Sequence, residues 1–494
     1  MRGLWRVQPV VGGRFMSTTV VQTAGVMRAA DVRALLGDPP PPFLIEEADA
    51  AARRAYYHLR HEAFVEHQGL FDNTDLDDHD EDPRTIVLVA RTADGTVIGG
   101  VRLGPATTGP DIGWWQGGRL VVAGSQSGAP ERGRARGTSS ASNKLAGVGA
   151  ALVRAACARA EEAGALRFDA TVQLGTQRFF TRLGWETVRP VTVASTPHVL
   201  MRWPIGRIAR LVAATKSALG PLLQGIGPDG YVGDDGAPVP GSELVAACDA
   251  ILPAMVERDP EWAGWCSVLV NVNDLAAMGA VPVGLLDALG ARDAAAAERV
   301  LTGLKRASAA FGVPILGGHT QLGVPAALSV TAFGRTAHPV AGGGGRSGEQ
   351  VRLTADLGGG WRPGYAGRQW DSTSHRTPDE LRTMVTAVGR ARPSAAKDVS
   401  MAGVVGTLGM LAEASGCAAV LDVAAVPKPG TASMGDWLTC FPGFAMLTTC
   451  PIEAGPATSA VCGELTTGQG VVLRWPDGEV TEALAAGVTG MGAA

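Results

Sequence analysis

The chain has 494 residues, a formal net charge of −4 and a hydrophobic content of 46%. This length exceeds one ordinary core, so two or three domains are expected. The weak net charge provides no general attraction to nucleic acid or anionic lipid. No apolar run reaches the roughly 18–20 residues that cross a bilayer. Seven scattered cysteines without a Cys-x-x-Cys pair favour reduced thiols and a cytoplasmic location. We therefore expect small-molecule substrates, and neither nucleic acid nor a membrane as partner.

The first part of the chain predicts a mixed α/β domain after a leader. Residues 1–42 end in four prolines and are expected to be disordered. Residues 43–203 form the predicted domain, with a flexible Ser-, Gly- and Arg-rich insert at 124–143. Strands are expected near 43–48, 85–92, 96–103, 118–122, 166–172 and 199–203, and helices over 51–67, 148–162 and 177–183.

The second part predicts alternating strands and helices in two subdomains, 225–340 and 341–494, after a linking helix at 204–224. Strands are expected near 244–247, 283–289, 314–316, 326–333, 351–355 and 418–423, and helices over 263–278, 294–311, 379–391 and 400–415. The glycine run within 341–346 predicts a surface loop. The whole chain is thus assigned to the α/β and α+β classes.

A glycine-rich stretch opens the predicted helix at 148–162 and carries Lys144, Gly147, Gly149 and Ala150. Glycine lets the backbone approach a ligand, and the free N–H groups at a helix start favour phosphate. A tight turn alone explains the same pattern equally well.

The stretch resembles the Gln/Arg-x-x-Gly-x-Gly/Ala loop of GNAT acyltransferases, and 171–186 resembles that fold's closing segment. The resemblance implies a mixed, mostly antiparallel sheet with helices over 43–203. It also implies acetyl-CoA bound at Lys144, Gly147, Gly149 and Ala150 by an N-acetyltransferase of the nitrogen-starvation, nitrilase-cluster subfamily. Phe180 stands where many GNAT enzymes carry a proton-donating tyrosine. Glu66 and His67 are the candidate catalytic proton acceptors.

An acidic segment follows these two residues, with seven Asp and Glu residues between positions 72 and 82. Such a run is usually a solvated loop. The alternative is a rim of negative charge that attracts an amine substrate.

Short carboxylates among small residues recur in the second part: Gly233-Asp234-Asp235-Gly236, Asn273-Asp274 and Asp398-Val399-Ser400. Mg²⁺ prefers oxygen ligands and is bound by one or two carboxylates together with phosphate oxygens. An aspartate beside a serine, such as Asp398, also suits a helix N-cap. The adjacent charges of Asp234 and Asp235 are costly without a counter-cation, which favours a metal.

These motifs, with Met278-Gly279-Ala280 and Gly317-Gly318-His319-Thr320, resemble the PurM-like, AIR synthase-related proteins. The resemblance implies Mg²⁺ bound by Asp234, Asp235, Asp274 and Asp398, and ATP contacted by Gly317, Gly318 and Thr320. It also implies a homodimer formed through the PurM-like domain.

Residues 361–376 resemble a feature of the AIR synthase-related subfamily. Arg362, Arg368, His375 and Arg376 are candidates for recognising an anionic substrate. A packed aromatic lid is an equal alternative.

The sequence therefore predicts a bifunctional enzyme in nitrogen metabolism. An acetyl-CoA-dependent N-acetyltransferase is joined to an Mg-ATP-dependent, ligase- or kinase-like enzyme that acts on a small metabolite. The alternative is a non-catalytic CoA- and ATP-binding sensor or scaffold in which one or both halves are inactive.

Overall fold

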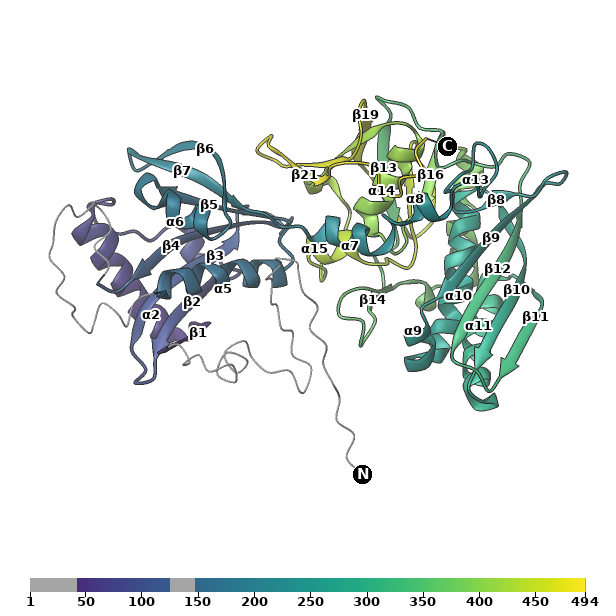
Figure 1. Cartoon of the computed structure of the whole chain (residues 1–494), viewed down its shortest axis with the longest axis horizontal. Coiled ribbons are helices and arrows are strands. Elements are labelled where there is room, and N and C mark those ends of the chain that lie inside the picture. Colours follow the sequence, from purple (N-terminus) through teal and green to yellow (C-terminus); the bar gives the residue numbers. More distant parts are fainter. Residues whose placement is uncertain (1–41, 125–146, 494) are drawn as a thin grey trace. The chain divides into compact units, whose positions relative to one another are not determined.

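The computed structural model describes residues 42–124 and 147–493 (Figure 1). These residues divide into two compact units. The N-terminal unit comprises the described residues of 42–106, 115–162 and 168–203, and the C-terminal unit comprises 107–114, 163–167 and 204–493. The predicted leader, apart from residue 42, and the predicted insert, apart from residue 124, lie outside the described residues.

The N-terminal unit is built on a seven-stranded sheet with the order β1-β2-β3-β4-β5-β7-β6. Its strands are β1 (Phe43–Glu47), β2 (Ile86–Thr92), β3 (Val97–Pro105), β4 (Trp114–Val122), β5 (Arg167–Gln173), β6 (Glu186–Val193) and β7 (Thr196–Trp203). Its helices are α2 (Ala50–His61), α3 (Asp78–Glu81), α5 (Val148–Glu162) and α6 (Gln177–Arg182). The sequence missed β6. The predicted helix at 51–67 changes after His61 into a π-helix, Glu62–His67.

Helices α2 and α5 cover opposite faces of this sheet. A Cβ atom on Gly100 would lie 2.5 Å from the Tyr56 ring of α2, whereas a Cβ atom on Gly99 would lie 3.3 Å from Leu152 of α5. Successive residues of a strand point to opposite faces, so the two glycines let a helix approach from each side. Glycine at 100 is required because Tyr56 is fully buried.

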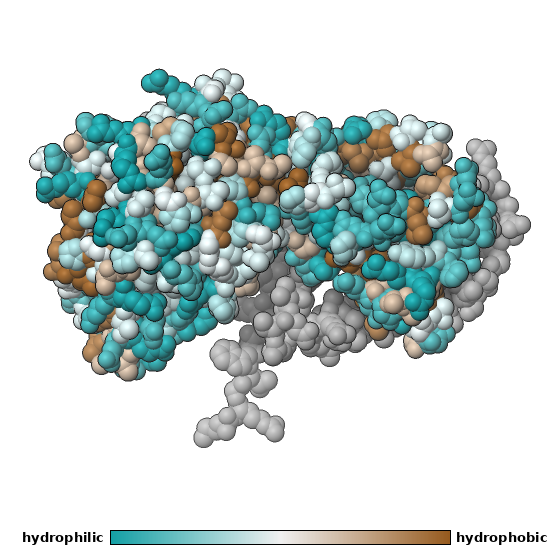
Figure 2. All heavy atoms as spheres, turned by 180° about the vertical axis from the view of Figure 1, so that it is seen from behind, coloured by the Kyte–Doolittle hydropathy of each residue, from teal (hydrophilic) through white to brown (hydrophobic). Residues whose placement is uncertain are grey.

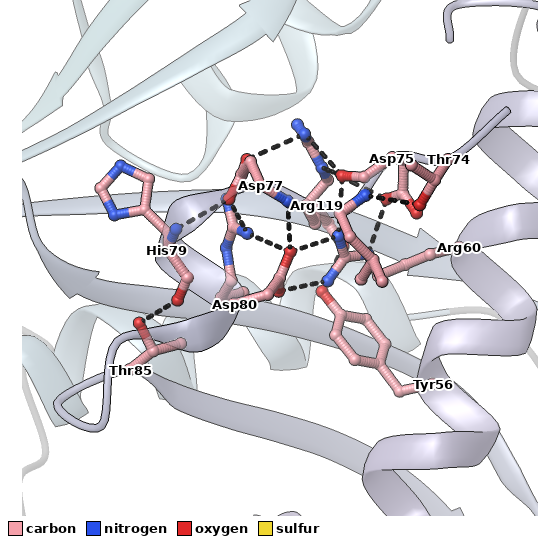
Figure 3. A network of polar contacts seen from close by, with 11 residues as sticks. Tyr56, Arg60, Thr74, Asp75, Asp77, His79, Asp80, Thr85 and Arg119 are labelled. Atoms are coloured by element: carbon pink, nitrogen blue, oxygen red, sulfur yellow. Dashed lines mark hydrogen bonds and ion pairs between the residues drawn. The ribbon is translucent and has the colours of Figure 1, made fainter. Parts of the chain in front are cut away.

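An ion-pair network joins α2 to the segment before β2 (Figure 3). The buried Arg60 guanidinium donates through Nε to Asp75 Oδ2 at 2.7 Å and through Nη1 to Asp80 Oδ1 at 2.7 Å. Arg119 donates to the Asp75 carbonyl oxygen at 2.8 Å and to Asp77 Oδ2 at 3.0 Å. Arg102 Nη1 lies 2.7 Å from Asp80 Oδ2.

Part of the acidic segment forms a buried ion-pair network, whereas Asp72, Asp78 and Glu81 are exposed. Asp75 is only 3% exposed, and Asp75, Asp77 and Asp80 are neutralised by arginines from α2, β3 and β4. The solvated-loop interpretation is wrong for these three residues, because arginines pair with them. The sequence did not reveal this pairing, since the partners lie up to 44 positions away along the chain.

The C-terminal unit contains two larger sheets and a two-stranded one. The five-stranded sheet has the order β11-β10-β12-β9-β8, and the seven-stranded sheet has the order β16-β18-β13-β19-β17-β20-β21. The first comprises β8 (Ala237–Pro238), β9 (Leu244–Ile251), β10 (Val281–Ala291), β11 (Ile315–Leu322) and β12 (Ala327–Arg335). The second comprises β13 (Gln350–Ala355), β16 (Ala396–Asp398), β17 (Ala418–Asp422), β18 (Ala445–Thr448), β19 (Thr458–Thr466), β20 (Val471–Arg474) and β21 (Val480–Leu484). Strands β14 (Gly360–Trp361) and β15 (Trp370–Asp371) form the small sheet.

Helix α10 (Pro260–Ala277) forms the centre of the five-stranded half and packs on β9, β12 and α11 (Ala294–Phe311). It begins with a proline at its first position, where no intrahelical N–H bond is lost. It is apolar on almost all sides and correspondingly buried. Helix α14 (Gly403–Ala414) is the buried helix of the seven-stranded half. The unit also contains α9 (Pro253–Arg258), α12 (Pro378–Val385), α13 (Ala387–Ala391) and α15 (Met434–Thr439).

Two expectations for this unit were wrong. The single linking helix at 204–224 is replaced by α7 (Arg207–Thr215) and α8 (Leu219–Leu222), because the chain leaves the helical conformation at Lys216. The glycine run at 341–346 is not simply a surface loop, since Gly342 and Gly345 are buried. Within the two described ranges, no helix has both the length and the apolar character needed to cross a membrane.

The Arg60 network predicts a large stability effect. Arg60→Met should lower the free energy of unfolding of the N-terminal unit by about 3–5 kcal/mol, because it leaves the Asp75 and Asp80 carboxylates without their buried partner. The matched control, Arg54→Met, removes an exposed arginine from the same helix and should change it by less than about 0.5 kcal/mol. Urea denaturation measures both, and equal effects would contradict a special role for the network.

Candidate functional site

The four aspartates predicted to bind metal lie in one region of the C-terminal unit. Asp234 and Asp235 precede β8, Asp274 lies in the last turn of α10, and Asp398 ends β16. Burial, and then the charges of Asp398 and Asp249, raise the pKa of Asp274 well above its usual range. Burial and the charges of Asp235 and Asp249 do the same to the pKa of Asp398. Such mutual repulsion requires carboxylates that lie close together.

The sequence missed the pairing role of Lys397, a buried cation of this cluster. Its Nζ donates to Asp235 Oδ1 at 2.9 Å and to the Gly233 carbonyl oxygen at 3.0 Å, and lies 3.7 Å from Asp234 Oδ1. The side chain is 1% exposed. Burial alone would lower the pKa of Lys397, but the charges of Asp235 and Asp234 outweigh it and raise that pKa. The counter-cation expected at Asp234 and Asp235 is thus already part of the chain.

Backbone N–H groups complete the environment of these two carboxylates. The Gly342 N–H donates to Asp234 Oδ2 at 3.0 Å, and the Asp398 N–H donates to Asp235 Oδ2 at 3.0 Å. A Cβ atom on Gly342 would lie 2.5 Å from Asp234 Oδ1 and 2.7 Å from Lys397 Cε. The glycine run lets the backbone approach these side chains, which explains why part of it is buried.

Asp249 is a further carboxylate that sequence reasoning missed. It lies in β9, and the sequence of this strand contains no motif that indicates a metal or nucleotide site. Burial is the main cause that raises its pKa, and the Asp235 charge adds to it. Next to Asp274, the buried Asn273 donates through Nδ2 to the Gly443 carbonyl oxygen at 2.7 Å.

The donor set fits a divalent cation on one side of the cluster. Asp398 Oδ2 and Asp234 Oδ1 are buried and accept no hydrogen bond from the described residues. Asp274 and Asp398 repel each other and lack an ammonium partner of the kind Asp235 has, so a hard cation with oxygen ligands suits them. Across 42–124 and 147–493, no three His, Cys, Asp or Glu residues form a group ready to hold a metal. The carboxylates would therefore have to move towards a bound ion.

The glycine loop predicted for ATP is not brought to this cluster. Gly317, Gly318 and Thr320 are exposed residues of β11. Strands β10 and β12 separate β11 from β9, which places it about 14 Å away at the usual strand spacing. A Cβ atom on Gly318 would lie 2.2 Å from Asp287 Oδ1, so the neighbouring strand accounts for that glycine.

Three of the four predicted substrate residues, Arg362, His375 and Arg376, line a cavity of about 530 Å³ together with Trp265, Arg306 and Trp361. Arg368 does not line it. Arg362 is paired with Asp259 at 2.9 Å and Arg376 with Asp356 at 2.6 Å. These ion pairs occupy the two guanidinium groups and favour the packed-lid interpretation for both.

The N-terminal unit contains a second cavity, of about 580 Å³, lined by residues of β3, β4, α5, β5 and α6. Gly149 lines it, whereas Gly147 and Ala150 stand beside it at the start of α5, and Lys144 lies outside the described residues. The charged residues Asp77, Arg102 and Arg119 line the same cavity.

The proposed proton acceptors do not reach this cavity. Glu66 and His67 are exposed and absent from its lining, although Phe64 and Gln68 of the same segment contribute to it. Phe180 lines the cavity and packs edge-on against Trp185 at 5.5 Å. It offers no proton.

Comparison with known proteins defines the family of the C-terminal unit. The N-terminal domain of AIR synthase related proteins matches residues 233–336, and the C-terminal domain of the same proteins matches 342–485. The uncharacterised protein sll0787 of Synechocystis is 36% identical over 224 residues, which span 44% of this chain and 69% of that protein. The chain belongs to the AIR synthase-related family. Asp234, Asp235, Asp249 and Asp274 come from its first domain, and Lys397 and Asp398 from its second.

Two further similarities concern named proteins. Thiamine-monophosphate kinase of Synechococcus elongatus is 34% identical over 124 residues, which span 23% of this chain and 38% of that enzyme. The solved structure of AaThiL, complexed with AMPPCP and TMP, has 23% identity and a TM-score of 0.40, and covers 50% of this chain and 89% of its own.

The close approach at Gly342 makes a prediction for this AIR synthase-related unit. Gly342→Ala should lower the free energy of unfolding by about 1–3 kcal/mol, because the added methyl group overpacks Asp234 and Lys397. Gly430→Ala is the control, since a Cβ atom there meets nothing within 4 Å. Denaturant titration of both variants is the measurement. A neutral Gly342→Ala would show that the cluster is loosely packed.

Proposed function

We propose that the C-terminal unit is an ATP-dependent, kinase- or ligase-like enzyme that acts on a small metabolite. The observation that carries this proposal is the buried carboxylate cluster formed where the two family domains meet. Similarity to thiamine-monophosphate kinases over part of the unit supports it. Phosphoryl transfer needs positive charge and positioning more than covalent help from the protein, which suits a site made of carboxylates, an ammonium group and backbone N–H groups.

Asp274 and Asp398 are the residues proposed to hold Mg²⁺. The ion, when bound, supplies positive charge to the phosphate oxygens of the nucleotide. The chain's own groups then have separate roles. Lys397 holds Asp234 and Asp235 in place, the Gly342 N–H fixes the orientation of the Asp234 carboxylate, and burial of Asp274 and Asp398 keeps water from competing for the same oxygens.

The second candidate function, an acyl-CoA-dependent N-acetyltransferase, belongs to the N-terminal unit. Two features of the cavity support it: its volume of about 580 Å³ and the presence of Gly149 in its wall at the start of α5. The third is the sheet, in which β1 and β2, β2 and β3, β3 and β4, β5 and β7, and β6 and β7 pair antiparallel. Without a proton donor at Phe180, catalysis would depend mainly on positioning the amine and the thioester. A role in nitrogen metabolism is proposed only together with this acetyltransferase function.

The proposed homodimer would use the five-stranded sheet. Exposed apolar side chains gather on β10 and β11, among them Val281 at 53%, Leu316 at 61% and Leu322 at 52% exposure. Figure 2 shows brown side chains along the margin where this sheet lies, on the left of the view. Apolar patches of this kind are typical of interaction surfaces.

Asp274→Asn tests the ATP-dependent function. It should weaken binding of a non-hydrolysable ATP analogue with Mg²⁺ by at least about tenfold, because a carboxylate ligand is lost. Asp379→Asn, which changes an exposed aspartate of the same unit, should bind the analogue normally. Isothermal titration calorimetry gives both affinities. Unchanged nucleotide affinity in Asp274→Asn would refute the metal assignment.

Gly118→Leu tests the acyl-CoA function. Gly118 lines the N-terminal cavity, and a Cβ atom there meets nothing within 4 Å, so a leucine side chain has open space to fill. Acetyl-CoA affinity should fall by at least about tenfold. Gly175→Leu, outside the cavity lining, is the control.

The same measurements distinguish an enzyme from a sensor. If the wild type binds acetyl-CoA and Mg-ATP but turns over neither with a broad panel of amines and carboxylates, the non-catalytic alternative is favoured. If it binds no acetyl-CoA, the acyltransferase proposal fails.

A further inference from the structure

We propose that His198 is the group in the N-terminal cavity that takes the proton of an attacking amine. This inference rests on the acyl-CoA-dependent function proposed above and fills the role that the sequence assigned to Glu66 and His67. His198 lies on β7, which pairs with β5 on one side and with β6 on the other (Figure 1). The residue is only 6% exposed, and it lines the cavity of about 580 Å³.

A hydrogen bond to the backbone fixes the position of the hydrogen on the His198 ring. The Nδ1 atom lies 2.8 Å from the Thr196 carbonyl oxygen of the same strand. A carbonyl oxygen only accepts, so Nδ1 carries the hydrogen in this contact. In the neutral imidazole the lone pair then belongs to Nε2, which has no hydrogen-bond partner among the described residues. The ring is therefore held as a proton acceptor, with a nitrogen that the fold does not use.

Few other groups in the wall of the cavity can take a proton. Of the described residues that line it, five are titratable: Asp77, His79, Arg102, Arg119 and His198. Arginine stays protonated and cannot serve. Asp77 accepts from Arg102 Nη2 at 2.9 Å and from Arg119 Nη2 at 3.0 Å. Burial alone would raise the pKa of Asp77, but the hydrogen bond and the charge of Arg102 outweigh it and lower that pKa, which makes the carboxylate a poor base.

His79 is the other histidine of the wall, and its setting differs. Its backbone N–H donates to Asp77 and its carbonyl oxygen accepts from Thr85, but no hydrogen bond of its ring is found in the described part of the chain. No described contact therefore fixes which nitrogen of the His79 ring accepts a proton. Only His198 combines a place in the cavity wall with a defined accepting nitrogen.

The surroundings of His198 suit a primary amine. Gln173 of β5 lies directly opposite His198 in the antiparallel pair, so both side chains are on the same face of the sheet with Cβ atoms about 5 Å apart. Gln173 also lines the cavity, and its Nε2 donates to Gln68 Oε1 at 2.8 Å. This contact leaves the side-chain oxygen of Gln173 as a second acceptor. An amine with two N–H groups can therefore donate one to His198 and one to Gln173.

The proposed step conserves atoms and charge. The amine nitrogen attacks the carbonyl carbon of the thioester, the C–N bond forms, and the C–S bond breaks with its electron pair on sulfur. His198 Nε2 takes one proton from the amine nitrogen and passes it to the leaving thiolate. The products are the amide and the free thiol of coenzyme A, and the imidazole ends neutral. Phe180 then needs no proton of its own, because the proton of the amine serves the leaving group.

His198→Asn in the full chain tests this role. Its side chain keeps an N–H donor for the Thr196 carbonyl oxygen and loses only the accepting nitrogen. With acetyl-CoA and a panel of primary amines, kcat should fall at least about 100-fold. Acetyl-CoA affinity, measured by calorimetry, and the melting temperature should stay near the wild-type values. His58→Asn, at an exposed position of α2 outside the cavity lining, is the control and should keep the wild-type kcat. Wild-type kcat in a folded His198→Asn would overturn the inference.

The position of the ring hydrogen can be measured in the wild type, whether or not the variant folds. Long-range ¹H–¹⁵N NMR of the His198 ring, assigned from its backbone resonances, should show hydrogen on Nδ1 and a lone pair on Nε2. Hydrogen on Nε2 of the neutral ring would overturn the inference. A wild type that binds acetyl-CoA but acetylates none of the amines would also overturn it, since no proton then has to be moved. Failure to bind acetyl-CoA would instead refute the acyltransferase function on which the inference rests.

Discussion

The C-terminal unit depends on neutralising carboxylates that are buried where two domains of one family meet. Lys397 lies beside Asp234 and Asp235, the charge of Lys216 acts on Asp249 and Asp398, and burial makes each unpaired negative charge costly. The contact between Lys397 and Asp235 ties the segment before β8 to β16. The same requirement for charge leaves Asp274 and Asp398 suited to a further cation. The need to neutralise these buried carboxylates therefore affects both the stability of the C-terminal unit and its proposed binding of a metal ion.

In the N-terminal unit, arginines neutralise the aspartates that lie in or near the interior. Asp75, Asp77 and Asp80 form ion pairs with Arg60, Arg102 and Arg119, and the network extends to the wall of the cavity. Guanidinium groups suit this task because their fixed geometry serves two carboxylates at once. In both units, an acidic motif is explained by a basic residue from another element of the fold.

The proposed functions divide between these two environments. A carboxylate-rich site with one internal ammonium group suits a nucleotide with its metal, whereas a largely apolar cavity with a charged end suits a thioester and an amine. Each unit holds its own candidate site within the described residues. The two proposed activities can therefore be tested independently by variants in one unit at a time.

Local sequence determined most elements and the identity of the C-terminal family. Apolar spacing predicted α5 and α11 with their observed bounds, and the Asp-containing motifs led to the carboxylate cluster. The sequence did not reveal Asp249 or the pairing role of Lys397, and it missed the strands β18 to β21 and the break after Thr215. Gly317, Gly318 and Thr320, which the sequence predicts to contact ATP, lie on β11, and β10 and β12 separate that strand from β9. Periodicity and motifs report on neighbours along the chain. Only the tertiary structure decides which distant charges meet in the interior, because long-range packing brings them together and burial makes their pairing necessary.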